Sequence, residues 1–266
     1  MTTEARIHPS AQVAAARIGA GVRVEALAVV GEGAVLEDAC VLGLAACVGP
    51  GAVVGAGAQV AEGAVVAAGV QVGAGARITA GAVVTRQVPP RAVVEGHVAT
   101  IVGYVDAPAH STARALPMAP GATDSVVRGV RLHVMREVKD MRGDLCAAEI
   151  GRELPFMVQR SFLVYNVPNA EIRGEHAHRR CAQFLIAVKG SIHVVADDGA
   201  RREEFCLDHP RLGLYLPPMT WGIQYRYSEG AVLMVLASEP YNPADYIRDY
   251  GEFLALVTGG VSHDCA

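Results

Sequence analysis

Aliphatic residues recur at every sixth position through the first hundred residues of the chain. Twelve of them keep one register without a break, namely Ile18, Val24, Val30, Leu36, Leu42, Val48, Val54, Val60, Val66, Val72, Ile78 and Val84. An amphipathic helix would instead repeat about every 3.6 residues. A period of six is typical of the hexapeptide repeat of a parallel β-helix, in which three hexads close one triangular coil. The pattern therefore predicts about four coils, preceded by a less regular one; a plain sheet is the alternative.

The pattern changes near residue 105. From Val126, short apolar runs alternate with turn signals every eight to twelve residues, which predicts a β-sandwich or barrel. The sequence DDG at 197–199 predicts a hairpin turn. Residues 242–257 look like a short helix, which Asn242 would cap with Pro243 in the first position. We therefore expect an all-β chain with a β-helix over 1–105, a linker over 106–125 and a barrel over 126–266.

Composition excludes several classes of protein. A net charge of -4 and a pI near 6.1 give no electrostatic reason to bind nucleic acid or an anionic membrane. Apolar runs end well before the roughly 18 residues of a membrane helix, and the N-terminal sequence MTTEARIHPS has no feature of a signal peptide. The six cysteines form no CxxC pair. Free thiols in a reducing cytoplasm are therefore expected.

Two histidines, His176 and His178, stand one residue apart; four residues separate them from Gln183, and six more separate Gln183 from Gly190. This spacing resembles the first motif of cupin barrels, whose metal-binding members have a Glu where this chain has Gln183. The second motif, GLYLPPMTWGIQ at 213–224, has Trp221 and Gly222 near the place of the third histidine ligand. Two imidazoles alone make a poor site for iron, manganese or zinc. We expect no metal, and a metal-dependent dioxygenase is the alternative.

Residues i and i+2 of a strand face the same side, so His176 and His178 should share one face, directed into the barrel. Two imidazoles close together in a pocket should not both carry charge, and a neutral imidazole near pH 7 accepts a proton. The alternative is a pair of core histidines. The charged residues nearby, Arg173, Glu175, Arg179 and Arg180, make a dry apolar core less plausible.

The β-helix closes with VVTRQVPPRAVVEGHVATIVGYV at 83–105. This segment resembles the end of the left-handed β-helix acyltransferases. The resemblance implies a left-handed trimeric prism that binds acyl-CoA between subunits, with a histidine as base. Here the repeats from Ile18 to Val84 contain no histidine and no inserted loop, and His97 is the nearby candidate base. An N-acyltransferase using acetyl-CoA and a trimerising scaffold therefore both remain open.

The barrel half carries an ordered set of motifs: DMRGDLCAAEIGRELPFMVQRSFLVYNVPNAEIRGEHAHRRCAQFLIAVKGSIHVVADDG, then LGLYLPPMTWGIQY, then VLASEPYNPADYIRDYGEF. These motifs span nearly all of 126–257 and resemble the dTDP-4-dehydro-6-deoxyglucose 3,4-ketoisomerases, cupin relatives of the dTDP-sugar epimerases. The domain order also resembles the WxcM-type fusions of such an isomerase to a hexapeptide acyltransferase.

The resemblance implies an isomerase that moves the carbonyl of a dTDP-4-keto-6-deoxyhexose from C4 to C3, on the way to 3-amino-3,6-dideoxysugars for surface polysaccharide. It gives the role of base to His176, with His178 as shuttle or electrostatic partner. The reaction passes through an enediolate and needs no metal or nicotinamide, because there is no net redox change. A metal-free module that only binds sugar nucleotides is a further alternative.

The resemblance also assigns the substrate contacts. Arg142, Arg160 and Arg173 match arginines of the family's substrate site, and their guanidinium groups suit diphosphate or enediolate oxygens; surface solvation is the alternative for each. Gln183 would bond a sugar hydroxyl. The last two substrate contacts, Tyr215 and Trp221, would flank the thymine or the sugar, or else belong to the core.

One position departs from the family, because many members have a tyrosine where this chain has Phe162, two residues after Arg160. Tyr165 should face the other side of the strand. The acid would then be another group, with His178 and Tyr215 as candidates.

The family resemblances also imply assembly. The β-helix would form trimers and the cupin dimers, so a homo-oligomer is expected, and both contacts together would give a hexamer.

Overall fold

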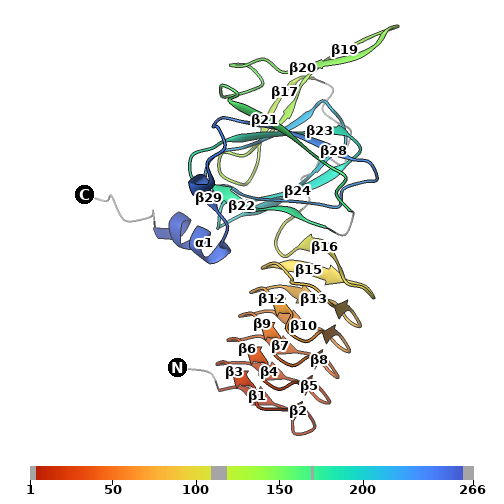
Figure 1. The fold of residues 1–266 in the computed structure, drawn as a ribbon, viewed down its shortest axis with the longest axis vertical. Coiled ribbons are helices and arrows are strands. Elements are labelled where there is room, and N and C mark those ends of the chain that lie inside the picture. Colours follow the sequence, from red (N-terminus) through yellow and green to blue (C-terminus); the bar gives the residue numbers. More distant parts are fainter. Residues whose placement is uncertain (1–3, 109–118, 169–170, 260–266) are drawn as a thin grey trace, which may run out of the picture. The chain divides into compact units, whose positions relative to one another are not determined.

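A computed structural model describes residues 4–108, 119–168 and 171–259 of the chain. It divides into two compact units, Met1–Val105 and Asp106–Ala266 (Figure 1). Both units are built of strands, and the described part of the chain adds one α-helix, α1 (Tyr250–Gly259). No helix among the described residues is long and apolar enough to cross a membrane.

The first unit is a β-solenoid whose coils stack on one another (Figure 1). Each coil contributes one strand to each of three parallel sheets, in the orders β1-β4-β7-β10-β13, β2-β5-β8-β11-β14 and β3-β6-β9-β12. The strands are β1 (Arg6–Ile7), β2 (Gln12–Val13), β3 (Arg17–Ile18), β4 (Arg23–Val24), β5 (Val29–Val30), β6 (Val35–Leu36), β7 (Val41–Leu42), β8 (Cys47–Val48), β9 (Val53–Val54), β10 (Gln59–Val60), β11 (Val65–Val66), β12 (Gln71–Val72), β13 (Arg77–Ile78) and β14 (Val83–Val84).

The six-residue period explains the core of the solenoid. Val24 pairs with Leu42, and Leu42 with Val60, so aligned residues of successive coils lie three hexads apart. Ile18, the first of the twelve aliphatic positions, is half-buried, and the other eleven, from Val24 to Val84, are buried. Close stacking demands glycine at some corners. A Cβ added to Gly49 would meet the backbone nitrogen of Ala68 at 2.6 Å. The predicted β-helix is confirmed.

The solenoid ends in a different kind of pairing. Strand β15 (Ala92–Glu95) continues the parallel stack on β13, and β16 (Thr100–Tyr104) then turns back to pair with β15 in the antiparallel sense. His97 lies exposed in the turn between these two strands.

The second unit consists of two mainly antiparallel sheets around one apolar core, which is the predicted cupin-type barrel. One sheet has the order β17-β18-β26-β23-β28-β21 and the other β25-β24-β27-β22-β29. The first comprises β17 (Gly121–Asp124), β18 (Arg131–Val134), β21 (Arg160–Tyr165), β23 (Gln183–Lys189), β26 (Leu212–Leu216) and β28 (Val232–Ala237). The second comprises β22 (Arg173–His178), β24 (Ile192–Asp197), β25 (Arg202–Leu207), β27 (Trp221–Tyr225) and β29 (Tyr246–Ile247).

Two expectations for this unit need correction. Gly121–Asp124 form β17 and pair with β18, so the barrel begins inside the segment expected to be a linker. The helix expected over 242–257 is divided. Asn242 does cap Pro243–Asp245, but these residues form the 3-10 helix η2, and β29 intervenes before α1 begins at Tyr250. Edge pairing of Tyr246 and Ile247 with β22 outweighs the local helical pattern. The predicted hairpin turn at DDG is confirmed by the pairing of Asp197 with Arg202.

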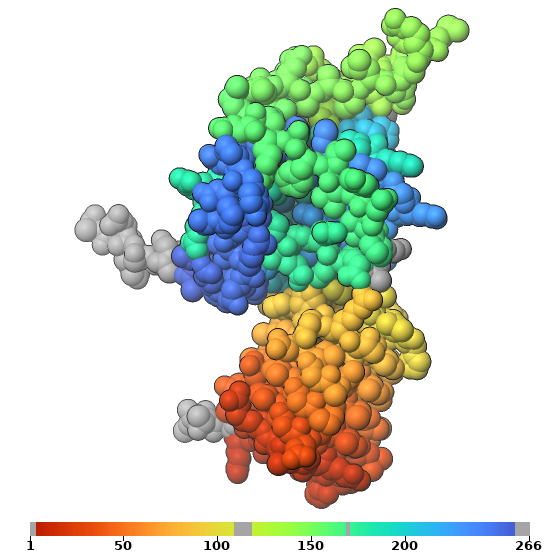
Figure 2. All heavy atoms as spheres, in the orientation of Figure 1, coloured from red at the N-terminus to blue at the C-terminus, as the bar shows by residue number. Residues whose placement is uncertain are grey.

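A long hairpin extends from the second unit. It is formed by β19 (Arg136–Asp140) and β20 (Gly143–Ala147), which pair with each other and with no third strand in the described part of the chain. Its free end projects away from the barrel (Figure 2). Val138, Met141 and Leu145 are more than half exposed there, so the hairpin presents apolar side chains that its own barrel does not cover.

Candidate active site

A bulge in β22 positions the first histidine of the motif. Gly174 pairs with Ile223 and His176 with Gly222, which leaves Glu175 as the extra residue. Gly174 and Glu175 both have positive φ angles, 83° and 51°. A Cβ on Gly174 would lie 2.5 Å from the carbonyl oxygen of Gly222, so this position requires glycine. The bulge turns the carbonyl of Gly174 toward the ring of His176.

The hydrogen bond to that carbonyl fixes the tautomer of His176. Nδ1 lies 2.8 Å from the oxygen of Gly174, which only accepts, so Nδ1 carries the proton and Nε2 keeps its lone pair. Burial lowers the pKa of His176 to about 4, against the effect of this hydrogen bond, and the neighbouring His178 and Arg248 lower it further. The imidazole is therefore neutral near pH 7 and has one free basic nitrogen.

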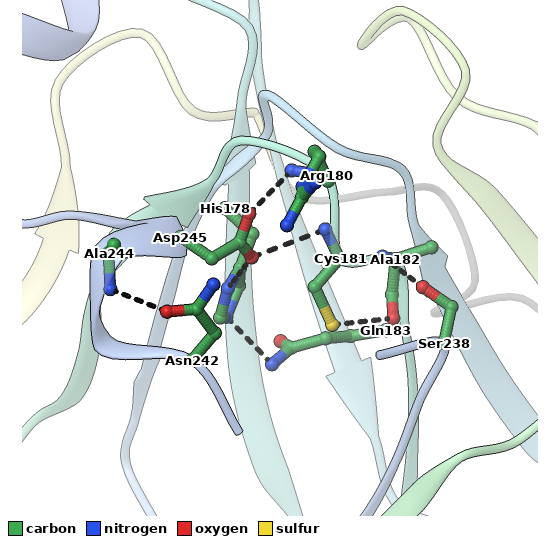
Figure 3. Close-up of polar contacts among 9 residues, drawn as sticks. All are labelled: His178, Arg180, Cys181, Ala182, Gln183, Ser238, Asn242, Ala244 and Asp245. Carbon is green, nitrogen blue, oxygen red and sulfur yellow. Dashed lines mark hydrogen bonds and ion pairs between the residues drawn. The ribbon is translucent and has the colours of Figure 1, made fainter. Parts of the chain in front are cut away.

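His178 is held at both ring nitrogens (Figure 3). Its Nδ1 lies 2.9 Å from Oδ2 of Asp245, and its Nε2 lies 3.1 Å from the amide nitrogen of Gln183. Nδ1–H therefore donates to the carboxylate, and Nε2 accepts from the amide. Burial lowers the pKa of His178 although Asp245 opposes this shift. The ring is fixed and neutral, and neither nitrogen is left for a substrate.

Asp245 reaches the site from η2, far along the chain. Besides His178, its carboxylate accepts backbone N–H groups from Arg180 at 2.8 Å and Cys181 at 3.3 Å (Figure 3). Burial disfavours the ionised form, but these three donors outweigh burial and hold the pKa of Asp245 below its ordinary value. A carboxylate with this many donors is a fixed negative charge behind His178.

Aromatic and cationic groups border the two histidines. The ring of Tyr246 lies 4.9 Å from that of His176 and 4.3 Å from that of His178. The guanidinium of Arg248 stacks on the ring of Tyr246 at 4.4 Å. Arg160 stacks at 5.1 Å on Phe162, and its charge also lowers the pKa of His178. Its Nε is buried and has no hydrogen-bond partner within the described part of the chain. Two cations thus favour any negative charge that develops beside the histidines.

A cavity opens between these groups. It is lined by His176, His178, Cys181, Gln183, Leu216, Pro217, Thr220, Gly222 and Gln224. It is small, with a free volume of about 10 Å³, which is room for roughly one water molecule. The lining combines polar groups, among them the two histidines and Gln183, with the apolar side chains of Leu216 and Pro217.

Three of the predicted site residues, His176, His178 and Gln183, meet in this cavity, and Arg160 lies beside it. The other predicted contacts lie elsewhere. Trp221 packs on the outer side of β27 against Tyr250 and Phe253 of α1, at 5.1 and 5.5 Å. Its neighbours Gly222 and Gln224 take the cavity side, because side chains alternate along a strand.

Tyr215 and two arginines also lie outside the cavity of their own chain. Tyr215 belongs to a second apolar cluster with Phe156, at 6.1 Å, on the side of β26 opposite the main core. Arg173 is exposed where β22 begins. Arg142 stands in the turn of the β19–β20 hairpin, with its side chain 90% exposed and bonded to Asp140 at 2.6 Å. Tyr165 is exposed on the face opposite Phe162, as predicted.

Several residues of the site carried no recognisable signal in the sequence. The local pattern predicts only that Asp245 belongs to a helix, and its pairing with a histidine 67 residues away depends on the fold. Tyr246 and Arg248 follow it in the same segment. Cys181 and Thr220 lie within the two cupin motifs, but at positions where the motifs specify no residue type. The alternation of faces along the strand WGIQ could have pointed to Gln224. Gly222 and Gln224 share one face of this strand, and Trp221 lies on the opposite face.

One group of these residues has the composition of a metal site. His178, Cys181 and Asp245 offer ligand atoms that all lie within 4.8 Å of one another, and all three residues are buried. It differs from a cupin metal site, which would use His176 together with His178.

Comparison with known proteins agrees with this architecture. A family model described as FdtA, WxcM-like, C-terminal, matches residues 128–258. The TDP-4-oxo-6-deoxy-alpha-D-glucose-3,4-oxoisomerase of Aneurinibacillus thermoaerophilus is 39% identical over 118 residues, which cover 85% of that protein and 44% of this chain. The chain belongs to the 3,4-ketoisomerase family.

Solved members of the ketoisomerase family match the second unit along nearly their whole length. A double mutant of QdtA, a 3,4-ketoisomerase from Thermoanaerobacterium thermosaccharolyticum in complex with TDP, is 31% identical with a TM-score of 0.50; the match covers 52% of this chain and 99% of that one. A 3,4-ketoisomerase from Helicobacter canadensis is 37% identical with a TM-score of 0.48, over 49% and 98% of the two chains. The second unit is therefore an isomerase.

Proposed function

We propose that the chain moves the keto group of a dTDP-4-keto-6-deoxyhexose from C4 to C3, with His176 as the base. The observation that supports this role is the neutral ring of His176, whose Nδ1 proton is bound to Gly174 and whose Nε2 is unprotonated beside the cavity. The family supports the substrate. A curated relative is named for TDP-4-oxo-6-deoxyglucose, and a QdtA variant is in complex with TDP-4-keto-6-deoxyglucose at 29% identity and a TM-score of 0.50.

The proposed reaction balances within the sugar. The C3–H bond breaks, its proton goes to Nε2 of His176, and its electrons form the C3–C4 double bond of an enediolate. Arg160 and Arg248 stabilise the negative oxygen. The hydroxyl proton on the C3 oxygen passes to the negative oxygen on C4, C4 receives the proton held by the imidazolium, and the carbonyl now stands at C3. No electron leaves the sugar, so neither a nicotinamide nor a metal is needed as a redox partner.

We also propose that His176 returns the proton to C4. Of the two other candidates, His178 already engages both ring nitrogens, and Tyr215 packs in a cluster outside the cavity. Phe162 has no proton to give. The imidazolium of His176 is then the acid closest to the enediolate, and base and acid would act from one face of the sugar. His178 and Asp245 are positioning residues, and the amide of Gln183 donates a hydrogen bond to Nε2 of His178.

Deuterium exchange tests the base directly. The protein is incubated with dTDP-4-keto-6-deoxyglucose in D2O, and NMR follows the C3 hydrogen and the product. His176→Asn should abolish both exchange and product while dTDP binding stays near normal. His193→Asn is the matched control, because His193 lies on the outer side of β24 beside Glu204; it should exchange like the wild type. Exchange that persists in His176→Asn would place the base elsewhere.

The hairpin suggests how Arg142 takes part. It stands exposed at the end of β19–β20, among the uncovered side chains of Val138, Met141 and Leu145. We propose that two cupin units pair by laying this hairpin over each other, so that each chain supplies Arg142 to the other's substrate diphosphate. A C2 dimer makes such an exchange reciprocal.

The solenoid supports assembly better than acyl transfer. In the sheet β14-β11-β8-β5-β2, the outward side chains of the last four coils form a column of Val29, Cys47, Val65 and Val83, and β2 adds Gln12 at the end of the column. The other two faces mix valines with arginines and glutamines, such as Arg23, Gln59 and Arg17. We propose that the aliphatic face joins three chains. His97, the candidate base for acetyl transfer, stands in an exposed turn. Trimers and dimers together would give a hexamer. The free state of the five described cysteines is consistent with a reducing cytoplasm.

A further inference from the structure

We propose that His178, Cys181 and Asp245 form a binding site for a thiophilic divalent cation such as zinc. The three ligand atoms come from three separate segments, the end of β22, the loop after it and η2, yet all lie within 4.8 Å of one another. Every one of these residues is buried, with relative exposures of 5%, 3% and 6%. Two of them, His178 and Cys181, also line the cavity.

The ligand set suits zinc or cadmium and not magnesium or calcium. Imidazole nitrogen, thiolate sulfur and carboxylate oxygen are the three donors of protein zinc sites, while hard cations take oxygen alone. Around a tetrahedral zinc these donors would stand about 3.5 Å apart. The present separations, up to 4.8 Å, need only small side-chain shifts to reach that value. The cavity leaves the fourth position for water, as in zinc sites with three protein ligands.

Charge and supporting contacts also favour the cation. A thiolate and a carboxylate neutralise a divalent ion, and binding releases the thiol proton of Cys181 because the metal ligand is the thiolate. The backbone N–H groups of Arg180 and Cys181 already orient the carboxylate of Asp245. Such contacts behind a ligand fix its direction.

Gln183 lets His178 change tautomer without leaving a buried polar atom unpaired. At present the amide nitrogen of Gln183 faces Nε2 at 3.1 Å, and Nδ1–H faces Asp245. A cation on Nδ1 moves the ring proton to Nε2. Rotation of the amide by half a turn then puts its oxygen against Nε2–H. The neutral imidazole therefore keeps two partners in both states.

The site would make the enzyme sensitive to zinc. An ion there replaces the hydrogen bond between His178 and Asp245 and occupies one wall of the cavity. Loss of isomerisation in the presence of zinc rests on the proposed function, but binding itself does not. The test therefore measures binding through the metal–thiolate bond.

The full chain is first treated with a chelator to remove any bound metal, and the chelator is then removed. Cadmium is titrated in, and the thiolate-to-cadmium charge-transfer band is recorded in the ultraviolet. We expect one equivalent in the wild type and loss of the band in Cys181→Ser. Cys206→Ser is the matched control for the thiol and should keep the band. His176→Asn separates this site from a cupin-type site, because only the latter would need that ring; it too should keep the band.

Any of three results would overturn the proposal: a wild type without the band, a band that survives in Cys181→Ser, or a band that disappears in His176→Asn. Because Cys181→Ser could misfold, the fluorescence of Trp221, the single tryptophan, checks its folding. The wild type also supplies a test that needs no variant. One equivalent of cadmium should protect Cys181, and not Cys206, from alkylation, as read by peptide mass spectrometry, and equal labelling of Cys181 with and without cadmium contradicts the site.

Discussion

Acid pH is the perturbation that most directly tests His176 as the base. Burial puts the pKa of its ring at about 4, compared with an ordinary value of 6.5. At pH 5 the ring would then be about 90% neutral, whereas an unperturbed histidine would be about 3% neutral. The acid limb of kcat/KM for C3-hydrogen exchange should therefore lie near pH 4, and most activity should remain at pH 5.

The same shift makes a prediction about stability. Between pH 4 and 6.5 the unfolded chain binds a proton at this position that the native ring does not, so stability falls as the pH drops through this window. At pH 5 the loss is about 2 kcal/mol. The depressed pKa of Asp245 matters only below its ordinary value of 3.8, outside the window.

Urea denaturation at pH 7 and pH 5 measures this difference. Trp221 reports on the cupin unit alone, because it is the single tryptophan and is buried against α1. His176→Asn should lose about 2 kcal/mol less than the wild type between the two values of pH. His178 is present in both proteins, so its own lowered pKa cancels to first order. An acid limb near pH 6.5, or equal losses in the two proteins, would refute the argument.

Three further predictions concern the bulge and the assembly. Gly174→Ala should lower the free energy of cupin unfolding by about 2 kcal/mol or more and abolish exchange, since its Cβ would meet the oxygen of Gly222; unchanged tryptophan-detected denaturation would contradict this. Val65→Lys should reduce the mass measured by light scattering threefold, while Gln59→Lys on another face should not; equal masses would exclude the aliphatic face. Arg142→Ala and His176→Asn should each be inactive alone, yet after mixing and subunit exchange recover about a quarter of wild-type activity, because half the dimers then hold one intact site. No recovery would mean that Arg142 does not act across the dimer.

The solenoid could be predicted from the sequence almost completely. Its contacts lie between residues three hexads apart, so a local period determines which side chains meet. The barrel type could also be predicted, because alternation and turn residues are local, and the shared face of His176 and His178 follows from the same alternation.

The rest of the site depends on contacts that no local pattern encodes. Asp245 meets His178 only because η2 lies beside the end of β22. Trp221 lies outside the cavity, on the side of β27 that α1 covers. Arg142 has the chemistry of a substrate contact, but its place on a projecting hairpin depends on the tertiary structure. A motif thus identified the residue types, and the fold decided which of them meet.

The exact repeat of three hexads has a consequence for how this chain tolerates change in length. Removing or adding one whole coil would shorten or lengthen the solenoid by one layer and leave every later side chain on its original face, since aligned pairs such as Val24 and Leu42 are related by that unit. Removing a single hexad would keep the aliphatic interior, but every later strand would move from its own sheet to the next of the three sheets. The column through Val65 would then be broken into segments on two sides of the prism. Insertions and deletions in natural variants should accordingly come in whole coils of three hexads, because only these keep each outward side chain on its original sheet.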